Sequence, residues 1–440
     1  MLQRLNALDK EIKIAIIGIG SIGKGLVLQA QLTPGIECVA IADIKLEKAI
    51  ACAEWLERDY EIVHNLHALH DAVVRGKLAI SDDGQLVAQC ELVDALIESS
   101  SAIEAGGIHG ITALKHNTHL IMMNYDADLL YGPLLMSLAE QNGLVYTSCD
   151  GDQPATIKRL IDDILLWGFD LVLAGNIKGY LDRRVNPTTI IPEADKRELD
   201  YRMCTSYTDG TKLNVEMAVV ANSLGLRTAV PGMLGPRANH VREVFDHFDF
   251  DVLWKETRKP LVDYLLGTEP LGGVFVVVHT SDEFQQFTLD WYPSEMGTGP
   301  YYYFYRPHHL GHIEAMACVA EAVLDGRALL KPDHGFQTNV FAYTRQELRQ
   351  GDVLDGIGGY TCYGLIENTV DDAGQPGIPI CLADQVVLRH DIGVDEKIGF
   401  RDVLFDPGEV RFKLYFDALR QAGQIVPEME ESSFKSIIAT

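Results

Sequence analysis

The sequence predicts an α/β protein in which a doubly wound parallel sheet is followed by an α+β domain and then by a small β-rich domain. Three observations support this fold class. Over roughly the first third of the chain, short apolar runs of strand length alternate with helical segments. The middle of the chain has buried-strand patterns with helices between them. From Phe336 onward, short strand patterns lie between turns rich in glycine and proline.

The composition is that of a globular protein, and a length of 440 residues predicts two or three domains. Acidic residues outnumber basic ones by 63 to 37, so the net charge of −26 argues against nucleic acid and against an anionic membrane as partners. No run approaches the roughly 18 apolar residues of a spanning helix, and the N-terminus lacks a signal-peptide pattern, so we expect a cytoplasmic protein. The eight scattered cysteines indicate reduced, mostly buried thiols.

The first strand, Lys13–Ile17, is followed at once by a glycine turn and then by a helix from Lys24 to Ala30. This order of strand, G-x-G-x-x-G turn and helix is the dinucleotide-binding pattern of a Rossmann unit. The first glycine allows a tight turn, the second lets the backbone approach a pyrophosphate, and the third permits close helix packing. The predicted pyrophosphate-binding residues are Gly18, Ile19, Gly20, Ser21, Ile22 and Gly23.

The second strand, Glu37–Ala42, ends at Asp43, where an acid would bind the hydroxyl groups of the adenosine ribose. We therefore expect NAD or NADP as cofactor. Asp43 favours NAD, although Lys45 could still neutralise the 2′-phosphate of NADP. The alternative is a Rossmann-like fold that binds another nucleotide or none.

The following strands bring further polar residues to the edge of the sheet where ligands collect. The strand Leu92–Glu98 is followed by Ser99, Ser100 and Ser101, which suit contact with a dinucleotide. The strand Thr118–Met123 ends at Asn124, which we expect near the nicotinamide. Helices are predicted at 109–115 and 133–142, and a last strand at 144–147.

The insertion between the second and third strands predicts two helices, Leu46–Asp59 and Leu66–Arg75, and a turn at 82–84. His64, His67 and His70 recur there at three-residue steps, as metal ligands can. Without a paired carboxylate or thiolate we assign them to a solvated helix face. No metal site is predicted, and the need for a divalent ion stays open.

The middle of the chain predicts an α+β domain for substrate binding and dimerisation. Asp209-Gly210 lies between two extended patterns and indicates a hairpin, with a returning strand at 212–215. The other predicted elements are the helices 157–167 and 216–224 and the strands 169–175 and 272–278.

Towards the end, an aromatic strand, Tyr301–Tyr305, precedes an apolar helix, Ile313–Leu324, that we expect to pack back onto the first domain. Four short strands follow, at 340–342, 357–360, 377–380 and 386–388. The predicted division is a dinucleotide-binding domain of residues 1–150 with 300–330, a substrate and dimerisation domain of 151–299, a β-rich domain of 331–425 and a tail of 426–440.

Hydride transfer to or from a carbon that bears oxygen needs a proton donor or acceptor for that oxygen. Lys178 follows a buried strand in a polar loop and is our first candidate. Glu216 could orient a substrate hydroxyl, share a proton with Lys178 or hold a divalent ion. The alternatives are a solvated loop lysine and a glutamate that stabilises the start of a helix.

A local basic cluster in this acidic chain consists of Arg306, His308 and His309. Arginine suits a bidentate grip on a phosphate or carboxylate, and either histidine could act as acid or base. We expect Lys212 and Asn222 to contact the substrate as well. The alternative for the cluster is an interdomain salt bridge with one packed histidine.

With these segments in view, the chain resembles the homoserine dehydrogenase-like oxidoreductases that carry a C-terminal SAF domain. Within that group it looks most like the 1-deoxy-D-xylulose 5-phosphate reductoisomerase-like enzymes. Four motifs carry the resemblance: the glycine turn, His119–Asn124 with Ala127-Asp128, Val215–Ala218 with Ala221-Asn222, and Gly299–Tyr301 with Arg306–Leu310. The resemblance implies a homodimer, a Rossmann domain completed by the returning helix, and a SAF-like β domain.

Two departures narrow the function. The Asn176–Gly179 stretch lacks the asparagine-glycine-threonine loop of true homoserine dehydrogenases, and Asp43 stands where NADP-dependent relatives favour a basic group. We therefore expect an NAD(P)-dependent dehydrogenase or oxidoisomerase acting on a polyol, a sugar-derived hydroxy acid or a sugar phosphate. The alternatives are a sugar-phosphate reductoisomerase and a dinucleotide-binding sensor or carbohydrate-binding scaffold without turnover.

Overall fold

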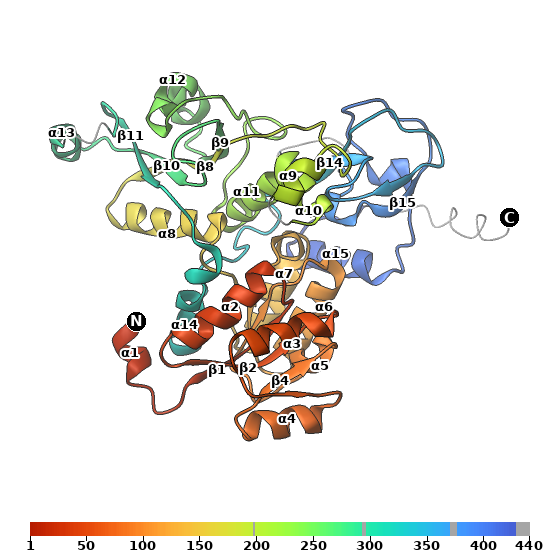
Figure 1. The fold of residues 1–440 in the computed structure, drawn as a ribbon. Coiled ribbons are helices and arrows are strands. Elements are labelled where there is room, and N and C mark those ends of the chain that lie inside the picture. Colours follow the sequence, from red (N-terminus) through yellow and green to blue (C-terminus); the bar gives the residue numbers. More distant parts are fainter. Residues whose placement is uncertain (197–198, 293–295, 370–375, 428–440) are drawn as a thin grey trace. The chain divides into compact units, whose positions relative to one another are not determined.

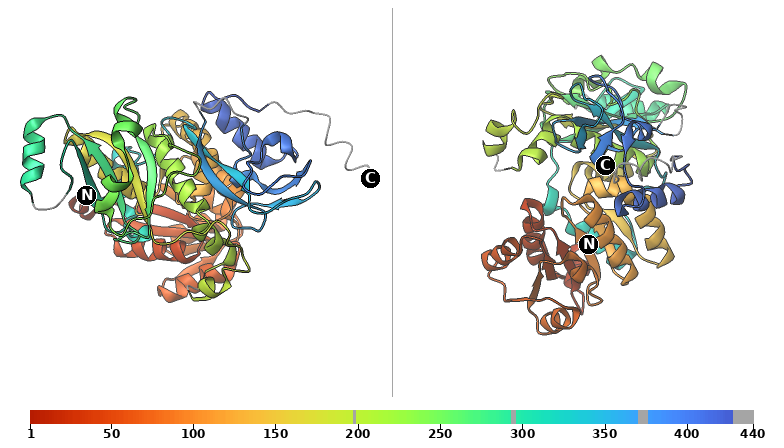
Figure 2. Two further views of the ribbon diagram at one scale, coloured as in Figure 1. Left: turned by 90° about the horizontal axis from the view of Figure 1, so that it is seen from above. Right: turned by 90° about the vertical axis from the view of Figure 1, so that its right-hand side faces the viewer.

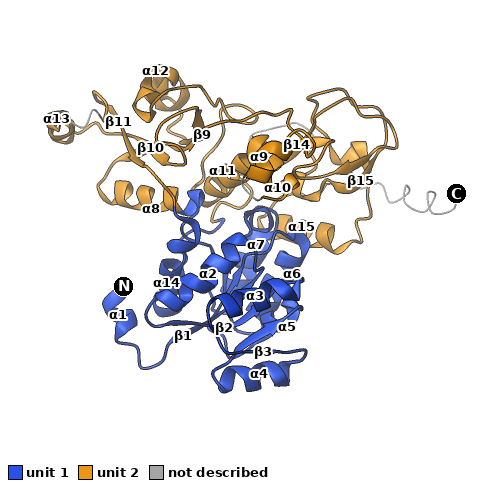
Figure 3. Ribbon diagram, viewed as in Figure 1, with its two compact units in different colours: residues 1–155, 310–332 blue, residues 156–309, 333–440 orange. Residues whose placement is uncertain are grey.

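The chain folds into two compact units, each built from two separate stretches (Figures 1 and 3). The computed structural model describes residues 1–196, 199–292, 296–369 and 376–427. Unit 1 comprises residues 1–155 and 310–332, and unit 2 comprises residues 156–309 with the described residues from 333 onward. The chain therefore passes between the units three times.

Unit 1 contains a seven-stranded sheet in which every neighbouring pair of strands is parallel, which confirms the predicted α/β fold class. The strands, in spatial order, are β3 (Tyr60–Ile62), β4 (Leu78–Ser81), β2 (Ile36–Ala42), β1 (Ile12–Ile17), β5 (Ala95–Glu98), β6 (His119–Met122) and β7 (Tyr146–Ser148). The helices are α1 (Leu2–Asn6), α2 (Ser21–Leu32), α3 (Leu46–Trp55), α4 (Leu66–Val74), α5 (Gly84–Ala88), α6 (Ile103–Lys115), α7 (Tyr125–Gln141) and α14 (Met316–Asp325), with a short turn of helix, η3 (Gly311–Ile313).

The strand order of this sheet reverses at β1, because the chain builds outward from β1 to β2 on one side and to β5 on the other. In open α/β sheets, ligands bind at the carboxyl ends of the strands at such a switch point. The glycine turn follows β1, and Ser99–Ser101, which we call the serine loop, follow β5. The Ser99 N–H donates to the Ile17 carbonyl oxygen. The topology therefore places both predicted cofactor segments at one point.

The insertion differs from its prediction, because it adds β3 and β4 to the sheet beside its two helices. Both strands are only three or four residues long, so their alternation carries little signal in the sequence. Asp83, predicted within a turn, caps α5 by accepting from the Gln85 N–H at 2.8 Å. His67 forms an exposed pair with Asp71 on α4.

The returning segment completes unit 1. The helix predicted at 313–324 is present as α14, and it belongs to this unit. After it, Leu329 and Leu330 donate their N–H groups to the Thr147 hydroxyl on β7, at 3.0 and 3.1 Å. The edge of the sheet thus closes against residues more than 180 positions later in the chain.

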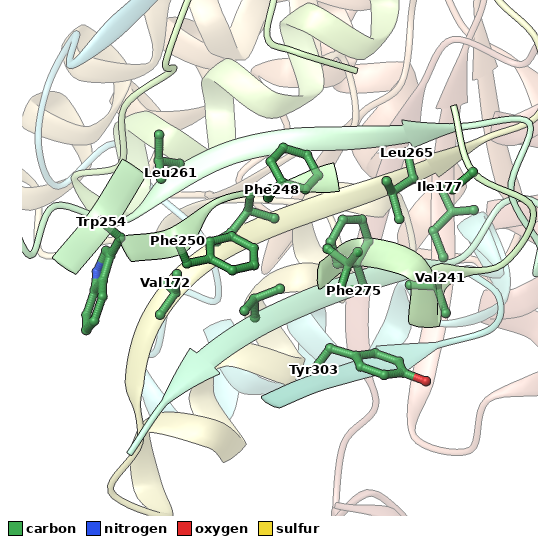
Figure 4. Close-up of a cluster of buried hydrophobic side chains, with 14 residues drawn as sticks. Val172, Ile177, Val241, Phe248, Phe250, Trp254, Leu261, Leu265, Phe275 and Tyr303 are labelled. Carbon is green, nitrogen blue, oxygen red and sulfur yellow. The ribbon is translucent and has the colours of Figure 1, made fainter. Parts of the chain in front are cut away.

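Unit 2 contains a four-stranded mixed sheet with an apolar core on one face (Figure 4). Phe275 and Ile177 on the sheet pack there with Phe248, Phe250 and Trp254 from the connecting segments. Truncating a fully buried aromatic residue such as Phe275 would cost about 3–5 kcal/mol. The strands, in spatial order, are β11 (Tyr301–Arg306), β10 (Val274–His279), β8 (Asp170–Lys178) and β9 (Leu261–Leu266).

The hairpin predicted at Asp209-Gly210 is wrong, because the two segments are helices. They are α10 (Tyr201–Thr208) and α11 (Thr211–Leu224). Gly210 adopts a left-handed conformation, with φ of 90°, and Asp209 accepts from the Thr211 N–H, so the pair joins two helices as readily as two strands. The predicted strand at 212–215 is the first part of α11, which is buried against β9, β12 and β14.

The remaining helical elements of unit 2 lie around the sheet and at the end of the chain. They are α8 (Gln153–Leu166, which begins in unit 1), α9 (Ile191–Lys196), η1 (Val241–Glu243), α12 (Val244–His247), η2 (Asp251–Lys255), α13 (Glu283–Trp291), η4 (Ile380–Leu382), η5 (Phe400–Asp402) and α15 (Val410–Gln421).

The predicted β-rich region is present, and its relation to the SAF domain stays a prediction. Its strands are β12 (Thr338–Thr344) paired with β14 (Cys362–Asn368), and β13 (Val353–Asp355), β15 (Asp384–Leu388) and β16 (Val403–Leu404) in a second sheet. Residues 357–360 form turns rather than the predicted strand, and 377–380 make isolated bridges leading into η4. The tail from residue 428 lies outside the described residues.

The eight cysteines are all buried, as predicted, and none is joined in a disulfide in this structure. None of the helices in the described part of the chain combines the length and the apolar character that crossing a bilayer requires.

Candidate functional site

The glycine turn of unit 1 has little room for side chains. Gly18 has a φ of 92°, and a Cβ atom there would lie 2.5 Å from the Ser100 nitrogen. A Cβ atom on Gly23 would lie 1.8 Å from the Gly18 carbonyl oxygen, whereas Gly20 faces open space. The geometry matches the three roles that the sequence predicts: a tight turn, an open approach at the second glycine and close packing at the third.

The N-terminus of α2 follows this turn without a side-chain cap. Gly20 is its N-cap residue, and no acidic residue lies in the first turn. The first N–H groups of a helix have no partner within the helix, and they carry a partial positive charge. Together with the open approach at Gly20, this end of α2 fits the pyrophosphate of a dinucleotide.

Asp43 is held against the same turn. One carboxylate oxygen accepts from the Ile19 N–H at 2.7 Å, and the other accepts from the Lys45 N–H at 2.9 Å. Each oxygen of a carboxylate has two acceptor positions, so both can still receive a ribose hydroxyl. Asp43 therefore ties the end of β2 to the glycine turn, and its predicted ribose contact stays a prediction.

The serine loop after β5 braces the turn from the other side. The Ser99 hydroxyl lies 2.9 and 2.8 Å from the carbonyl oxygens of Ile17 and Gly18, and Ser101 is exposed. Ser100 donates its N–H to the fully buried Glu98, whose second oxygen lies 2.8 Å from His109 Nδ1. The sequence did not indicate the Glu98–His109 pair, because the two residues stand on separate elements with no motif between them.

Asn124 is buried at the start of α7, where its side chain accepts from the Ala127 N–H at 3.1 Å and donates to the Ala102 carbonyl oxygen at 3.2 Å. These bonds cap α7 and join it to the start of α6. In this structure Asn124 positions two helices, and its predicted contact with the nicotinamide stays a prediction.

In unit 2, the candidate catalytic residues gather at one end of the four-stranded sheet. Lys178 is the last residue of β8 and Arg306 is the last residue of β11. The register pairs Arg306 with Val274 and Val274 with Asn176, two residues before Lys178. Because alternate residues of a strand share a face, Arg306 and Lys178 lie on the same face, two strand spacings across and two residues along, or roughly 12 Å apart.

Lys178 is paired with Glu216 across this face. Its ammonium nitrogen lies 3.5 Å from a carboxylate oxygen of Glu216, and the Glu216 side chain is only 4% exposed. A compensating charge stabilises a buried carboxylate, and removing one partner of such a pair leaves the other uncompensated. Glu216 therefore restrains the Lys178 ammonium group at this end of the sheet.

The remaining predicted residues are distributed unevenly. His309 Nδ1 lies 2.6 Å from the Gly272 carbonyl oxygen in the turn before β10, and His308 is exposed. Lys212 stands four residues before Glu216 on α11, so the two share a helix face. Asn222 is buried at the other end of α11, where it accepts from the Thr338 N–H at 2.8 Å. Asn222 thus holds α11 to β12, and its substrate contact stays a prediction.

Residues 151–315 match the family model described as "Oxidoreductase DRL, catalytic domain". The matched stretch contains Lys178, Glu216, Arg306 and both histidines of the basic cluster. No curated protein matches the chain. The glycine turn lies outside the matched residues.

Solved structures of oxidoreductases are similar in part. DOX-P reductoisomerase in complex with NADPH, fosmidomycin and magnesium is 15% identical, with a TM-score of 0.36, over 48% of this chain and 57% of that one. Myo-inositol dehydrogenase from Lactobacillus casei, in complex with NAD(H) and myo-inositol, is 21% identical, with a TM-score of 0.28, over 43% and 53%. An oxidoreductase from Agrobacterium radiobacter, in complex with NAD+, L-tartaric acid and magnesium, is 13% identical, with a TM-score of 0.29, over 39% and 46%. The match spans about half the length of each solved structure, and none of these likenesses assigns a function to this chain.

Two arginines near Lys178, Arg183 and Arg237, were not predicted from the sequence. A bridge pairs Arg237 with Leu266, which pairs in turn with Lys178, so the three residues stand side by side on neighbouring strands. Arg183 and Arg237 both favour the ionised form of Tyr264 on β9, although burial dominates and raises the pKa of its hydroxyl. Within the described part of the chain neither guanidinium group forms an ion pair, unlike those of Arg58, Arg184 and Arg345.

Buried Asp263 explains how Arg237 is placed. Its carboxylate accepts from the N–H groups of Leu234, Gly235 and Tyr264, at 3.0, 2.8 and 2.8 Å. Burial nevertheless raises the pKa of Asp263 to about 6. These bonds fix the loop leading to Arg237 beside β9. No sequence pattern links Arg237 to Lys178, since the connection is made only by this loop.

Among the described residues, no group of three or more His, Cys, Asp or Glu side chains is arranged to hold a metal ion.

Proposed function

We propose that the protein is an NAD(P)-dependent oxidoreductase that acts on a CH–OH group of a polyol, a sugar-derived hydroxy acid or a sugar phosphate. The observation that carries this proposal is the Lys178–Glu216 pair at the end of the unit 2 sheet, inside the stretch that matches an oxidoreductase catalytic domain. The glycine turn and the uncapped α2 of unit 1 support the cofactor.

The residues divide the work as follows. The glycine turn with α2 would hold the pyrophosphate, and Asp43 would hold the adenosine ribose and favour NAD. The nicotinamide cofactor, when bound, supplies or takes up a hydride. Lys178 gives a proton to the substrate oxygen in reduction, or accepts it in oxidation, while Glu216 holds the ammonium group in place.

An anionic substrate is favoured by the basic groups near Lys178. Arg306 lies on the same face of the sheet as Lys178, in the direction of β11. Arg237 lies two strand positions from Lys178 in the opposite direction, beyond β9. Guanidinium groups suit phosphate and carboxylate oxygens. These arginines lie on either side of Lys178 although the whole chain has a net charge of −26. This observation favours a sugar phosphate or a sugar acid over a neutral polyol, and it supports a sugar-phosphate reductoisomerase as the second candidate.

The decisive experiment is a substrate panel screened with NAD and NADP in parallel, with the fluorescence of the reduced nicotinamide as readout. The panel contains neutral polyols, their acids and their phosphates. We expect turnover with anionic members and none without cofactor. A protein that binds the cofactor but turns over no member would be a sensor or scaffold instead.

Cofactor binding is tested separately by calorimetry with Gly20→Asp, which places a carboxylate where the pyrophosphate would lie. Gln31→Asp, at the exposed far end of the same helix, is the matched control. The variant should lose cofactor binding and the control should keep it. If the wild-type chain binds neither dinucleotide, the proposed function is wrong.

A further inference from the structure

Helix α13 (Glu283–Trp291) lies in the connection between β10 and β11, away from the candidate catalytic residues. The register of these strands pairs Val274 with Arg306 at one end and His279 with Tyr301 at the other. Lys178 and Arg306 stand at the first end, and the connection that carries α13 leaves from the second. The helix is therefore not a lid over the site, and it needs another explanation.

The side of α13 that faces its own unit is polar. The Thr280 hydroxyl donates to the Gln285 side chain at 2.6 Å, and the Gln286 side chain donates to the Thr280 carbonyl oxygen at 2.9 Å. The Tyr302 hydroxyl lies 3.2 Å from a carboxylate oxygen of Asp290. This arrangement reverses the usual one, in which a surface helix turns its apolar stripe towards the protein.

The opposite side of α13 is aromatic and open to solvent. Phe284, Phe287 and Trp291 follow each other at three and four residues, so they share one face, and they are 75%, 63% and 80% exposed. The rings of Phe284 and Phe287 lie 6.2 Å apart. No residue of α13 is buried, and Figure 1 and the left panel of Figure 2 show the helix projecting beyond β10 and β11.

Exposed apolar side chains also lie at the end of α8, next to α13. The Gln285 side chain donates to the Trp167 carbonyl oxygen at 3.0 Å. Leu166 is 82% exposed and Trp167 is 48% exposed, and Tyr292, just after α13, is 58% exposed. We call the six residues the aromatic surface: Leu166, Trp167, Phe284, Phe287, Trp291 and Tyr292.

We propose that the aromatic surface is where a second copy of this chain binds. With about 150–250 Å² for each aromatic side chain, its exposed area is roughly 800 Å². The largest apolar patch of a typical monomer covers about 300–600 Å². A standard stable interface buries about 800 Å² on each partner. The surface is therefore large for a monomer and sufficient for one side of a dimer.

A second copy fits this surface because a two-fold axis brings identical patches together, and aromatic side chains at helical spacing can pack against their own equivalents. Addition of a strand to β11 is less suitable, because the Tyr303 N–H already donates to the Met296 carbonyl oxygen at 2.8 Å. Each copy carries a net charge of −26, so the copies repel each other. The contact must then be apolar, and salt should strengthen it by screening.

The test is sedimentation equilibrium of the full chain at low micromolar concentration, in low and in high salt. We expect a dimer that tightens with salt. Phe284→Ser with Trp291→Ser removes two central aromatic anchors and should weaken dimerisation by at least about 100-fold. The matched control is Val74→Ser with Val252→Ser, which changes two side chains that are 75% and 72% exposed elsewhere. It should leave the dimer intact.

A second measurement uses the unmodified aromatic surface. Thr288 lies on the aromatic side of α13, and all eight native cysteines are buried, so Thr288→Cys adds one accessible thiol. A short bismaleimide should join two copies through Cys thioethers at this position and leave the Val74→Cys control monomeric. A monomeric wild-type chain would overturn the proposal. So would a dimer that survives the double serine substitution, or a lack of cross-linking at position 288.

Discussion

The glycine turn of unit 1 and the Lys178 end of the unit 2 sheet assemble their groups in opposite ways. The turn is built from backbone: the N-terminus of α2, the Ile19 N–H on Asp43 and the Ser100 N–H on Glu98. The Lys178 end is built from side chains, and Lys178, Glu216, Arg306 and Arg237 come from four separate segments.

This difference predicts different sensitivities. A site made of backbone tolerates changes of many side chains but not an added Cβ atom at its close contacts. A site made of side chains tolerates small backbone shifts but not the loss of one functional group. Substitutions in the two regions should therefore separate cofactor binding from turnover, and the following predictions are ordered by the size of the expected effect.

Lys178→Met should lower kcat by about 10²–10⁴-fold, the range for loss of a general acid or base. The dissociation constant of the cofactor should not change, since no side chain of the glycine turn is altered. Steady-state kinetics and a cofactor titration measure the two quantities. Lys255→Met removes an exposed lysine of the same unit and serves as control. A kcat within threefold of the wild type would remove Lys178 from the mechanism.

Gly23→Ala should weaken cofactor binding by about 100-fold or more, an effect of at least about 2.7 kcal/mol. The added Cβ atom would lie 1.8 Å from the Gly18 carbonyl oxygen, and only a shift of the turn itself can relieve that contact. Fluorescence titration with the reduced cofactor measures the effect. Gln31→Ala, on the exposed side of α2, should bind normally. Normal binding by Gly23→Ala would show that the turn is not the pyrophosphate site.

Arg306→Ala should raise the KM of an anionic substrate by about 10–100-fold, because hydrogen bonds to charged groups contribute roughly 1.5–3 kcal/mol. The KM of the cofactor should stay unchanged. Arg401→Ala, in the C-terminal part of unit 2, provides the control. An unchanged substrate KM in Arg306→Ala would show that Arg306 does not bind the anionic group of the substrate.

Asp43→Asn should shift the ratio of NADP to NAD affinity by about 10-fold towards NADP, or about 1.4 kcal/mol. The amide keeps an acceptor for the Ile19 N–H but removes the negative charge that a 2′-phosphate would meet. Titration with both cofactors gives the ratio, and Asp9→Asn is an exposed control. If the ratio does not move, Asp43 has no part in choosing the cofactor.

The smallest effect on either site is expected from Asp128→Asn, which should change stability alone. Burial raises the pKa of Asp128 to about 6, while hydrogen bonds from Ser148 and Tyr146 oppose the shift. The folded protein therefore holds this proton more tightly than the unfolded chain, so this group's stabilisation is complete below about pH 4 and is lost as the pH rises through about 6.

The loss amounts to at most about 3 kcal/mol, at roughly 1.4 kcal/mol per pKa unit. Relative to the wild type, Asp128→Asn should gain melting temperature between pH 4 and pH 7. Thermal unfolding over this range measures the gain. A constant difference between the two proteins would mean that Asp128 does not titrate in this window.

The same contrast explains how much could be predicted from sequence. β1, the glycine turn and Asp43 lie close together along the chain. The backbone geometry of each requires a specific residue type, so the pattern can be recognised in the sequence. Lys178 was identifiable because it follows a run with a buried-strand pattern, although β8 extends through Lys178, where a polar loop was predicted. Glu216 could be listed beside it, but only the packing of α11 brings the two within 3.5 Å.

Other features could not be predicted, for physical reasons. Asp209-Gly210 favours a reversal of the chain but does not specify strands or helices on either side. α11 was misassigned at its start because it is buried on almost every side, so its sequence lacks a clear amphipathic stripe. Arg237 depends on a loop held by Asp263, a contact between two segments with no shared motif.

The return of the chain to unit 1 has a consequence for synthesis. The hydroxyl of Thr147 receives its partners from Leu329 and Leu330, and the chain between them belongs largely to unit 2. At about 5–20 residues per second, a ribosome needs roughly 10–40 s to make that stretch. During this interval the nascent chain carries β7 as a sheet edge that still lacks its partners from Leu329 and Leu330.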